Sequence, residues 1–143
     1  MDTHSASPGF RSQLRATTSA SGIPYGYTIT IWSSGTVSVD VLGLPHVGEV
    51  LLFMAGAVLG FLALNGAAYG TLGIVTREPV ADRLPVWAFV HRISAGAAVV
   101  AVWAADHAIG GIAGWPVAGF LATSVYLVLH AAQATLVARA AGV

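Results

Sequence analysis

Hydrophobic residues dominate three long segments of the chain and are sparse near its start. Residues 50–75 contain no charged side chain, and at about 1.5 Å rise per residue a helix of this length exceeds the roughly 30 Å hydrocarbon core of a bilayer. Two further apolar segments follow, separated by short polar or glycine-rich stretches. The pattern predicts three transmembrane helices, over about 47–75, 85–108 and 115–138, in a membrane domain of residues 45–143.

The first 44 residues follow a different pattern. Residues 25–44 alternate between β-branched or aromatic side chains and small polar ones, and Ser34-Gly35 interrupts the alternation, which is typical of a β-hairpin. Residues 1–24 are rich in Ser, Thr, Gly and Ala, so burial cannot repay the entropy of ordering them. We expect an all-α integral membrane protein whose helices are preceded by a flexible tail and a short extracytoplasmic β-hairpin.

The composition supports a membrane location and excludes several function classes. Hydrophobic residues make up 56% of the 143 residues and charged residues only 8%, whereas soluble domains carry about 25% charged residues. Six acids balance six arginines, so the chain offers no basic surface for nucleic acid. It has no cysteine, and no phosphate-binding loop, nucleophile elbow or HExxH motif indicates an enzyme. We expect neither nucleic-acid binding nor catalysis.

Arginines near the ends of the apolar segments predict the orientation. Arg77 and Arg83 lie between the first two predicted spans and Arg139 follows the third, whereas residues 110–114 carry no charge. Because cytoplasmic loops are enriched in arginine and lysine, the C-terminus should be cytoplasmic and the N-terminus outside. Two arginines in the tail argue for the opposite orientation, but they lie far from the first span. The lysine-free, Ala- and Gly-rich sequence suggests a bacterial inner (cytoplasmic) membrane.

Arg92 and Asp106 are the most informative charges, because a charge inside a span costs about 2.5–3.5 kcal/mol and usually faces a bundle interior or a watery cavity. Their separation along the sequence places them within about 40° of one helix face and about 21 Å apart along the axis. Repeated around a symmetry axis, this stripe would form two charged rings of a channel. The alternative is that Arg92 extends to the lipid headgroups.

The polar residues of the predicted spans fall into two layers when depth is counted at about 1.5 Å per residue. The inner layer comprises Asn65, His91, Arg92, His130 and Gln133, and the outer layer comprises His46, Glu49, Asp106 and His107. Glu49 stands in a first helical turn, where a carboxylate meets the helix dipole favourably. Asp106 stands at a helix C-terminus, where a carboxylate is disfavoured, so it needs a partner, for which His107 and His46 are candidates.

The leading hypothesis is a homo-oligomeric channel or pore for an ion or small solute that needs no cofactor. Its candidate lining residues are Glu49, Asn65, His91, Arg92, Asp106 and Gln133.

Two alternatives stay open. In a haem- or metal-binding subunit of a redox complex, His91 and His130 would ligate haem b, or His46 and His107 would bind a metal with the acids beside them. In a structural or accessory subunit, the protein would pack within a larger membrane complex. Small residues such as those in the run 56–60 let helices approach closely in lipid, within one subunit or between copies.

Overall fold

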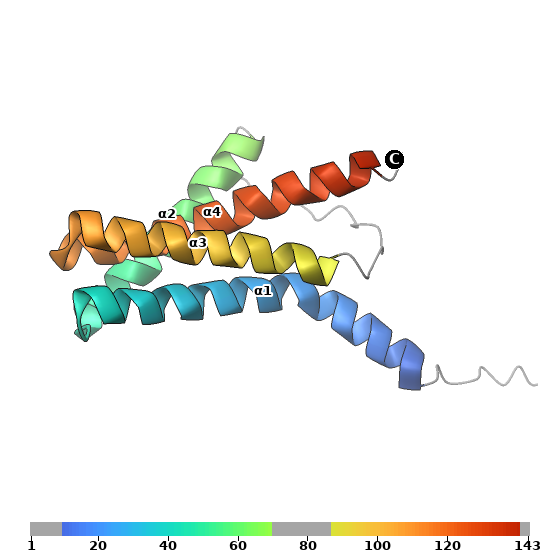
Figure 1. The fold of residues 1–143 in the computed structure, drawn as a ribbon, viewed down its shortest axis with the longest axis horizontal. Helices are drawn as coiled ribbons and strands as arrows, with labels where there is room; N and C mark the ends of the chain where they lie inside the picture. The colour runs from blue at the N-terminus through green and yellow to red at the C-terminus, as the bar shows by residue number, and fades with distance from the viewer. Residues whose placement is uncertain (1–9, 70–86, 141–143) are drawn as a thin grey trace, which may run out of the picture.

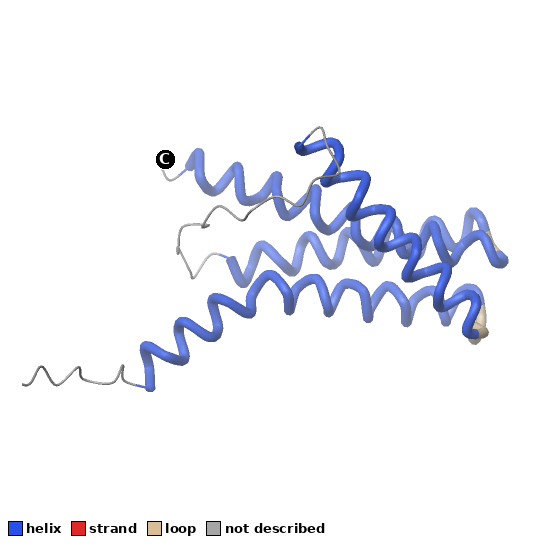
Figure 2. The backbone as a smooth tube through the Cα atoms, turned by 180° about the vertical axis from the view of Figure 1, so that it is seen from behind, coloured by secondary structure: helices blue, strands red, loops and turns tan. Residues whose placement is uncertain are grey.

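The computed structural model of the chain describes residues 10–69 and 87–140, which form four helices. Successive helices run in opposite directions, and the connections after the first and third helices lie at the same end of the bundle (Figure 1). The described residues contain no β-strand (Figure 2). The helices are α1 (Phe10–Leu42), α2 (Val47–Tyr69), α3 (Trp87–Ile109) and α4 (Gly111–Ala140).

The predicted β-hairpin over residues 25–44 is wrong, because this segment forms the second half of α1 and its C-terminal connection. The buried residues Gly26, Thr30, Ser34 and Ser38 recur every four positions. An interval of four is a multiple of the strand period and is also close to one helical turn. The alternation therefore fits either structure, and packing against other helices selects the helix.

Local hydrogen bonds also accommodate the many hydroxyl side chains of α1 within the helix. Thr30 Oγ1 donates to the carbonyl of Gly26 over 2.8 Å, and Thr36 Oγ1 donates to the carbonyl of Trp32 over 2.9 Å. These bonds to the carbonyl four residues back satisfy the hydroxyls within the helix. Gly35, expected in the hairpin loop, is part of the continuous helix.

Helices α1 and α3 end in the same way. Gly43 and Gly110 have φ angles of 95° and 64°, a left-handed conformation that glycine adopts without a Cβ clash. The N–H group of each donates over 3.0 Å to the carbonyl four residues back, on Val39 and Asp106. Each glycine therefore caps its helix and turns the chain towards the next one.

The prediction of three transmembrane helices is also wrong. Within residues 10–69 and 87–140, two helices are long and apolar enough to cross a membrane, over Val47–Ala68 in α2 and Gly111–Gln133 in α4. The described part of α3 carries Arg92, Asp106 and His107, which lower its mean hydropathy. Helix α1 begins at Phe10, inside the segment expected to be a flexible tail.

Helices α1, α3 and α4 form a three-helix bundle, and α2 packs mainly on α4. Helix α2 runs at an angle to the other three and separates from α4 towards its C-terminal end (Figures 1 and 2). The buried residues of α3, like those of α1, recur every four positions: Ser94, Ala98, Val102 and Asp106. Small side chains on both helices let the two backbones lie close together.

Helices α2 and α4 approach so closely that their contact excludes side chains. A Cβ atom at Gly56 would overlap the carbonyl of Pro116, and one at Gly119 would overlap the carbonyl of Phe53. At Gly60, an added Cβ would lie 2.8 Å from the carbonyl oxygen of Phe120. The close approach indicated by the small residues of run 56–60 is confirmed, with α4 of the same chain as the partner.

We predict that Gly119→Ala lowers the thermal midpoint of unfolding of the detergent-purified protein, measured by circular dichroism. The added methyl group meets backbone atoms of α2, and overpacking of this kind costs about 1–3 kcal/mol. The matched control is Gly96→Ala in α3, where an added Cβ has no atom within 4 Å. The control should leave the midpoint unchanged or raise it slightly. Equal midpoints for Gly119→Ala and the wild type would contradict the close crossing.

Candidate functional site

A buried carboxyl group lies where α1 packs against α3. Asp106 is 1% exposed, and Ser38 Oγ donates a hydrogen bond to its Oδ2 atom over 2.7 Å. The other oxygen, Oδ1, is buried and has no hydrogen-bond partner among the described residues. A buried polar atom without a partner costs about 1–3 kcal/mol. This oxygen therefore marks a position that a hydrogen-bond donor or a cation would stabilise.

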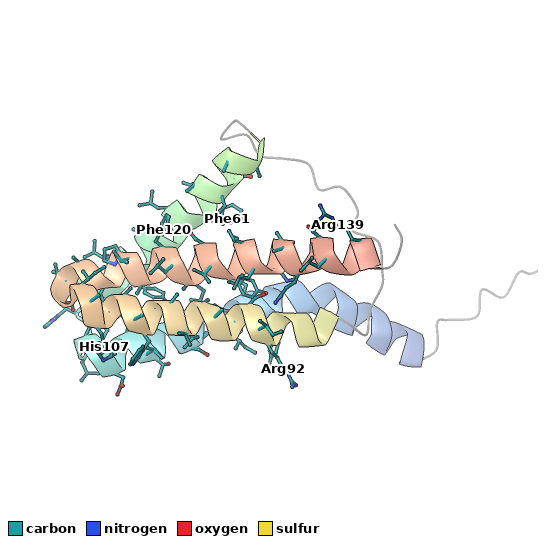
Figure 3. All side chains as sticks on the ribbon, turned by 45° about the horizontal axis from the view of Figure 1, so that its top comes forward. Phe61, Arg92, His107, Phe120 and Arg139 are labelled. Atoms are coloured by element: carbon teal, nitrogen blue, oxygen red, sulfur yellow. The ribbon has the colours of Figure 1, made fainter. Side chains whose placement is uncertain are left out.

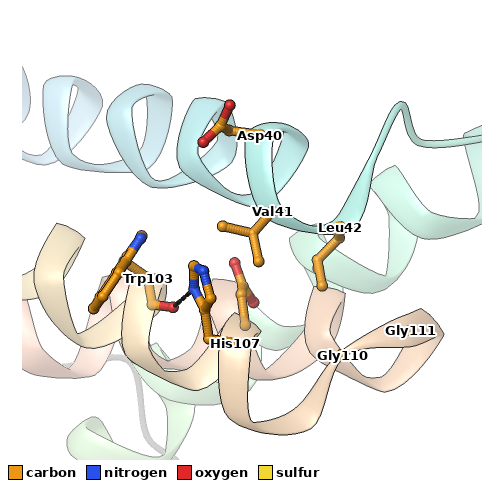
Figure 4. A pocket seen from close by; sticks show the side chains of 8 residues that line it. Asp40, Val41, Leu42, Trp103, His107, Gly110 and Gly111 are labelled. Atoms are coloured by element: carbon orange, nitrogen blue, oxygen red, sulfur yellow. Dashed lines mark hydrogen bonds between the residues drawn. The ribbon is translucent and has the colours of Figure 1, made fainter.

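Asp106 lines a pocket of about 520 Å³ at the end of the bundle (Figure 4). The rings of Trp103 and His107 lie in its wall with centroids 4.5 Å apart, and His107 Nδ1 is 2.9 Å from the carbonyl oxygen of Trp103. Because a carbonyl only accepts, Nδ1 carries the hydrogen, and Nε2 of the neutral ring is left as an acceptor. The remaining lining residues are Asp40, Val41, Leu42, Gly110 and Gly111.

The pocket lining is rich in acceptors and contains no lysine or arginine. Asp40 lies on the rim and is exposed, and its carboxyl group points away from Trp103 and His107 (Figure 4). Asp106 is therefore the buried carboxyl group at the base of this pocket. A lining of this kind suits a positively charged ligand or a hydrogen-bond donor.

More polar side chains follow the interior of the three-helix bundle away from the pocket. Tyr27 Oη lies 3.1 Å from Thr123 Oγ1, and the Tyr27 ring is 6.0 Å from that of Tyr126. The Tyr126 ring is in turn parallel to that of His130, with centroids 5.8 Å apart. Ser34 is fully buried, and its Oγ has no hydrogen-bond partner within the described part of the chain.

The interior polar residues continue to the far half of the bundle, where Ser94 Oγ donates to Gln133 Oε1 over 2.7 Å. We call the whole set the polar seam. It comprises Tyr27, Thr30, Ser34, Ser38, Ser94, Asp106, Thr123, Tyr126, His130 and Gln133. Three helices supply it, and its members are distributed from the level of the pocket to the level of α3 at which Arg92 lies.

Arg92 and Asp106 do not share an exposed stripe in the structure. Arg92 is exposed and points away from the bundle (Figure 3), whereas Asp106 is buried against α1. Residues four apart are offset by about 40° around a helix, so a buried stripe with this spacing rotates along α3. At the level of Arg92 the buried position is Ser94, about 200° around the helix from Arg92.

Glu49 and His46 form the N-terminal cap of α2. The backbone N–H of His46 donates to Glu49 Oε2 over 2.7 Å, and His46 Nδ1 lies 3.4 Å from the same oxygen. This is the backbone half of a capping box. In the described part of the chain, no three His, Asp or Glu residues form a group that could hold a metal ion. The structure therefore does not bring His46 and His107 together with Glu49 and Asp106.

The remaining candidates are distributed over α2, α3 and α4. Asn65 lies near the end of α2 and is half-buried, and Gln133 contacts α3 as described above. The side chain of His91 lies outside the described residues. Haem ligation by His91 and His130 therefore stays a prediction.

The sequence prediction misses Ser38, the partner of Asp106, because it places this residue in a strand. It also omits the other buried hydroxyls of α1. One signal could have found them, because small residues recur every four positions in 26–38, and Ser94 and Ala98 have the same spacing in α3. Two such repeats are typical of helices that pack closely together.

We predict opposite effects for two serine substitutions one turn apart in α1. Ser38→Ala leaves Asp106 without its donor and should lower the free energy of unfolding by about 1–3 kcal/mol. Ser34→Ala removes a buried hydroxyl that has no described partner, so it should leave stability unchanged or raise it. Thermal unfolding in detergent measures both. A destabilising Ser34→Ala combined with a neutral Ser38→Ala would contradict the hydrogen-bond assignment.

Comparison with known proteins does not assign the chain to a family. No protein-family model, no curated protein and no solved structure matches it. The function is therefore argued from the arrangement of its side chains.

Proposed function

We propose that the protein is an integral membrane protein that passes a small cation, a proton included, through the interior of the α1, α3 and α4 bundle. The observation that carries the proposal is the buried carboxyl group of Asp106, which has one oxygen bonded to Ser38 and the other without a described partner. Ionisable residues inside a membrane bundle are costly and mark ion or proton pathways.

The exterior of the molecule supports a lipid environment. Among the described residues, two helices are apolar and long enough to cross a membrane. Helix α2 packs mainly on α4 and exposes large apolar side chains on its remaining faces, including Val50, Leu51, Met54, Val58, Leu59 and Phe61. Water would disfavour such a surface, whereas acyl chains solvate it. In the proposed arrangement α2 and α4 cross the bilayer in contact with lipid, and α1 and α3 cross beside them, packed along α4 with their polar stripes facing inward.

The polar seam supplies groups that could carry a cation beyond Asp106. Hydroxyls both donate and accept hydrogen bonds, so Ser38 and Ser34 could solvate a cation or relay a proton towards Tyr27 and Thr123. This path lies within one chain and does not need a symmetric ring to enclose it. Self-association, which we retain as part of the proposal, would place several such paths side by side.

We predict that proteoliposomes containing the wild type take up K⁺ or protons faster than empty liposomes, as followed with internal fluorescent indicators. Asp106→Asn should reduce this flux by about tenfold or more, since it removes the buried charge that binds the cation. The matched control is Asp40→Asn, which removes the same charge from an exposed side chain on the pocket rim. It should keep the flux within about twofold of the wild type.

Two outcomes would contradict the proposal. One is a wild-type flux no greater than that of empty liposomes. The other is an Asp106→Asn flux equal to that of the wild type in protein that reconstitutes normally.

The fold suggests an orientation that removes a conflict between the arginines. Arg92 and Arg139 lie towards the end of the bundle where α3 begins and α4 ends (Figure 3). Arg11 stands in the first turn of α1, at the same end (Figure 1). The sequence pattern predicted that the two termini lie on opposite sides of the membrane, because it indicated three spans. We propose that this arginine-bearing end faces the cytoplasm of a bacterial inner membrane, with both termini on that side.

Labelling with a membrane-impermeant maleimide tests the orientation. Because the sequence has no native cysteine, a single-cysteine variant is labelled only at the introduced residue. Leu44→Cys, at an exposed position between α1 and α2, should be labelled in intact spheroplasts. Arg139→Cys, exposed near the end of α4, should be labelled only after the membrane is permeabilised. The reverse pattern would invert the proposed topology, and labelling of both in intact spheroplasts would reject it.

A further inference from the structure

We propose that the pocket at Asp106 binds a small organic monocation that carries an N–H group, such as an alkylammonium or arylammonium ion. This inference deepens the proposed function by naming the class of ion. It rests on the proposed function only for the claim that the bound ion is transported.

The charge of the lining favours a cation. Asp106 forms the buried part of the pocket, the carboxyl group of Asp40 on the rim points away from Trp103 and His107 (Figure 4), and none of the lining residues is a lysine or arginine. His107 donates its Nδ1 hydrogen to the carbonyl of Trp103, which leaves Nε2 of the neutral ring as another acceptor. An anion would find no lysine or arginine in this lining, and the Nδ1 hydrogen of His107 is already bonded to the carbonyl of Trp103.

The vacant acceptor favours a cation with an N–H group over a divalent metal ion. Ser38 already donates to Oδ2 of Asp106, and Oδ1 has no partner among the described residues. Because Oδ1 is buried, neighbouring side chains have to shift for a ligand to reach it. An N–H group placed there would satisfy this oxygen through a charge-assisted hydrogen bond. A divalent metal ion instead needs several oxygen ligands, and the described residues contain no group of three His, Asp or Glu side chains suited to one.

The wall of the pocket favours an organic ion. Trp103 is 51% exposed, and an indole face attracts a nearby cation through its quadrupole. Val41 and Leu42 supply apolar contact, while Gly110 and Gly111 present no side chains. The pocket is open to the surface, and its volume of about 520 Å³ leaves room for an ion of this size.

Calorimetric titration of the full-length protein in lipid nanodiscs tests the inference with three probes that share one aromatic body. Benzylammonium has both the charge and N–H groups, benzyltrimethylammonium has the charge alone, and benzyl alcohol has no charge. Benzylammonium should bind at least about tenfold more tightly than either of the others, because it alone combines a positive charge with an N–H group for Oδ1.

Three variants assign the binding to this pocket. Asp106→Asn should weaken benzylammonium binding by about tenfold or more, whereas the control Asp40→Asn should change it by less than about threefold. Trp103→Leu should weaken it several-fold through loss of the aromatic face, and this half-exposed position keeps the test usable if Asp106→Asn does not fold.

The outcomes separate this inference from the proposed function. Equal affinity for the three probes, or benzylammonium binding unchanged in both Asp106→Asn and Trp103→Leu, would overturn the ligand class. Cation flux in proteoliposomes without benzylammonium binding would overturn the ligand class and leave the transport role standing. Selective binding without any cation flux would uphold the binding site and reject the transport role.

Discussion

The rest of the structure depends on one constraint, which is that its helices approach closely only where small residues recur every four positions. In α1 and α3 these repeats bring a serine face against a face of Ser, Ala, Val and Asp. In α2 and α4 the corresponding contacts are made by Gly56 and Gly119, whose missing Cβ atoms leave room for the opposite backbone. The polar seam follows from this constraint, because hydroxyl side chains are small enough for such contacts and still carry hydrogen-bonding atoms.

Much of the helical framework could be predicted from local sequence. The long apolar segments correctly located most of α2, α3 and α4, because the length and composition of such a segment are sufficient to indicate a helix. Gly110, in the uncharged segment 110–114, caps α3 in the left-handed conformation. The sequence also indicated that Asp106 needs a partner. It could not identify Ser38, because that partnership spans 68 positions and exists only once α1 is recognised as a helix.

The errors have specific physical causes. The four-residue repeat of α1 matches both the strand and the helix period, so a pattern alone could not distinguish the two. The shared face assigned to Arg92 and Asp106 was calculated correctly for an isolated helix, but the buried stripe of α3 rotates along its length, and the two residues have opposite exposure. Hydropathy identifies the length of an apolar segment and does not show which of its polar residues another helix will cover.

The interface between α1 and α3 contains more buried polar side chains than its stability requires. Ala98 shows that a methyl group fills a position in this contact, and alanine in place of Ser34 would bury no polar atom. The described parts of α1 and α3 instead include two buried oxygens without described partners, on Ser34 and Asp106, in elements joined by the Ser38 hydrogen bond. Each such atom costs about 1–3 kcal/mol. Stability alone does not account for these groups, and this is the basis for our proposal that a proton or cation supplies the interactions that the folded chain leaves unmade.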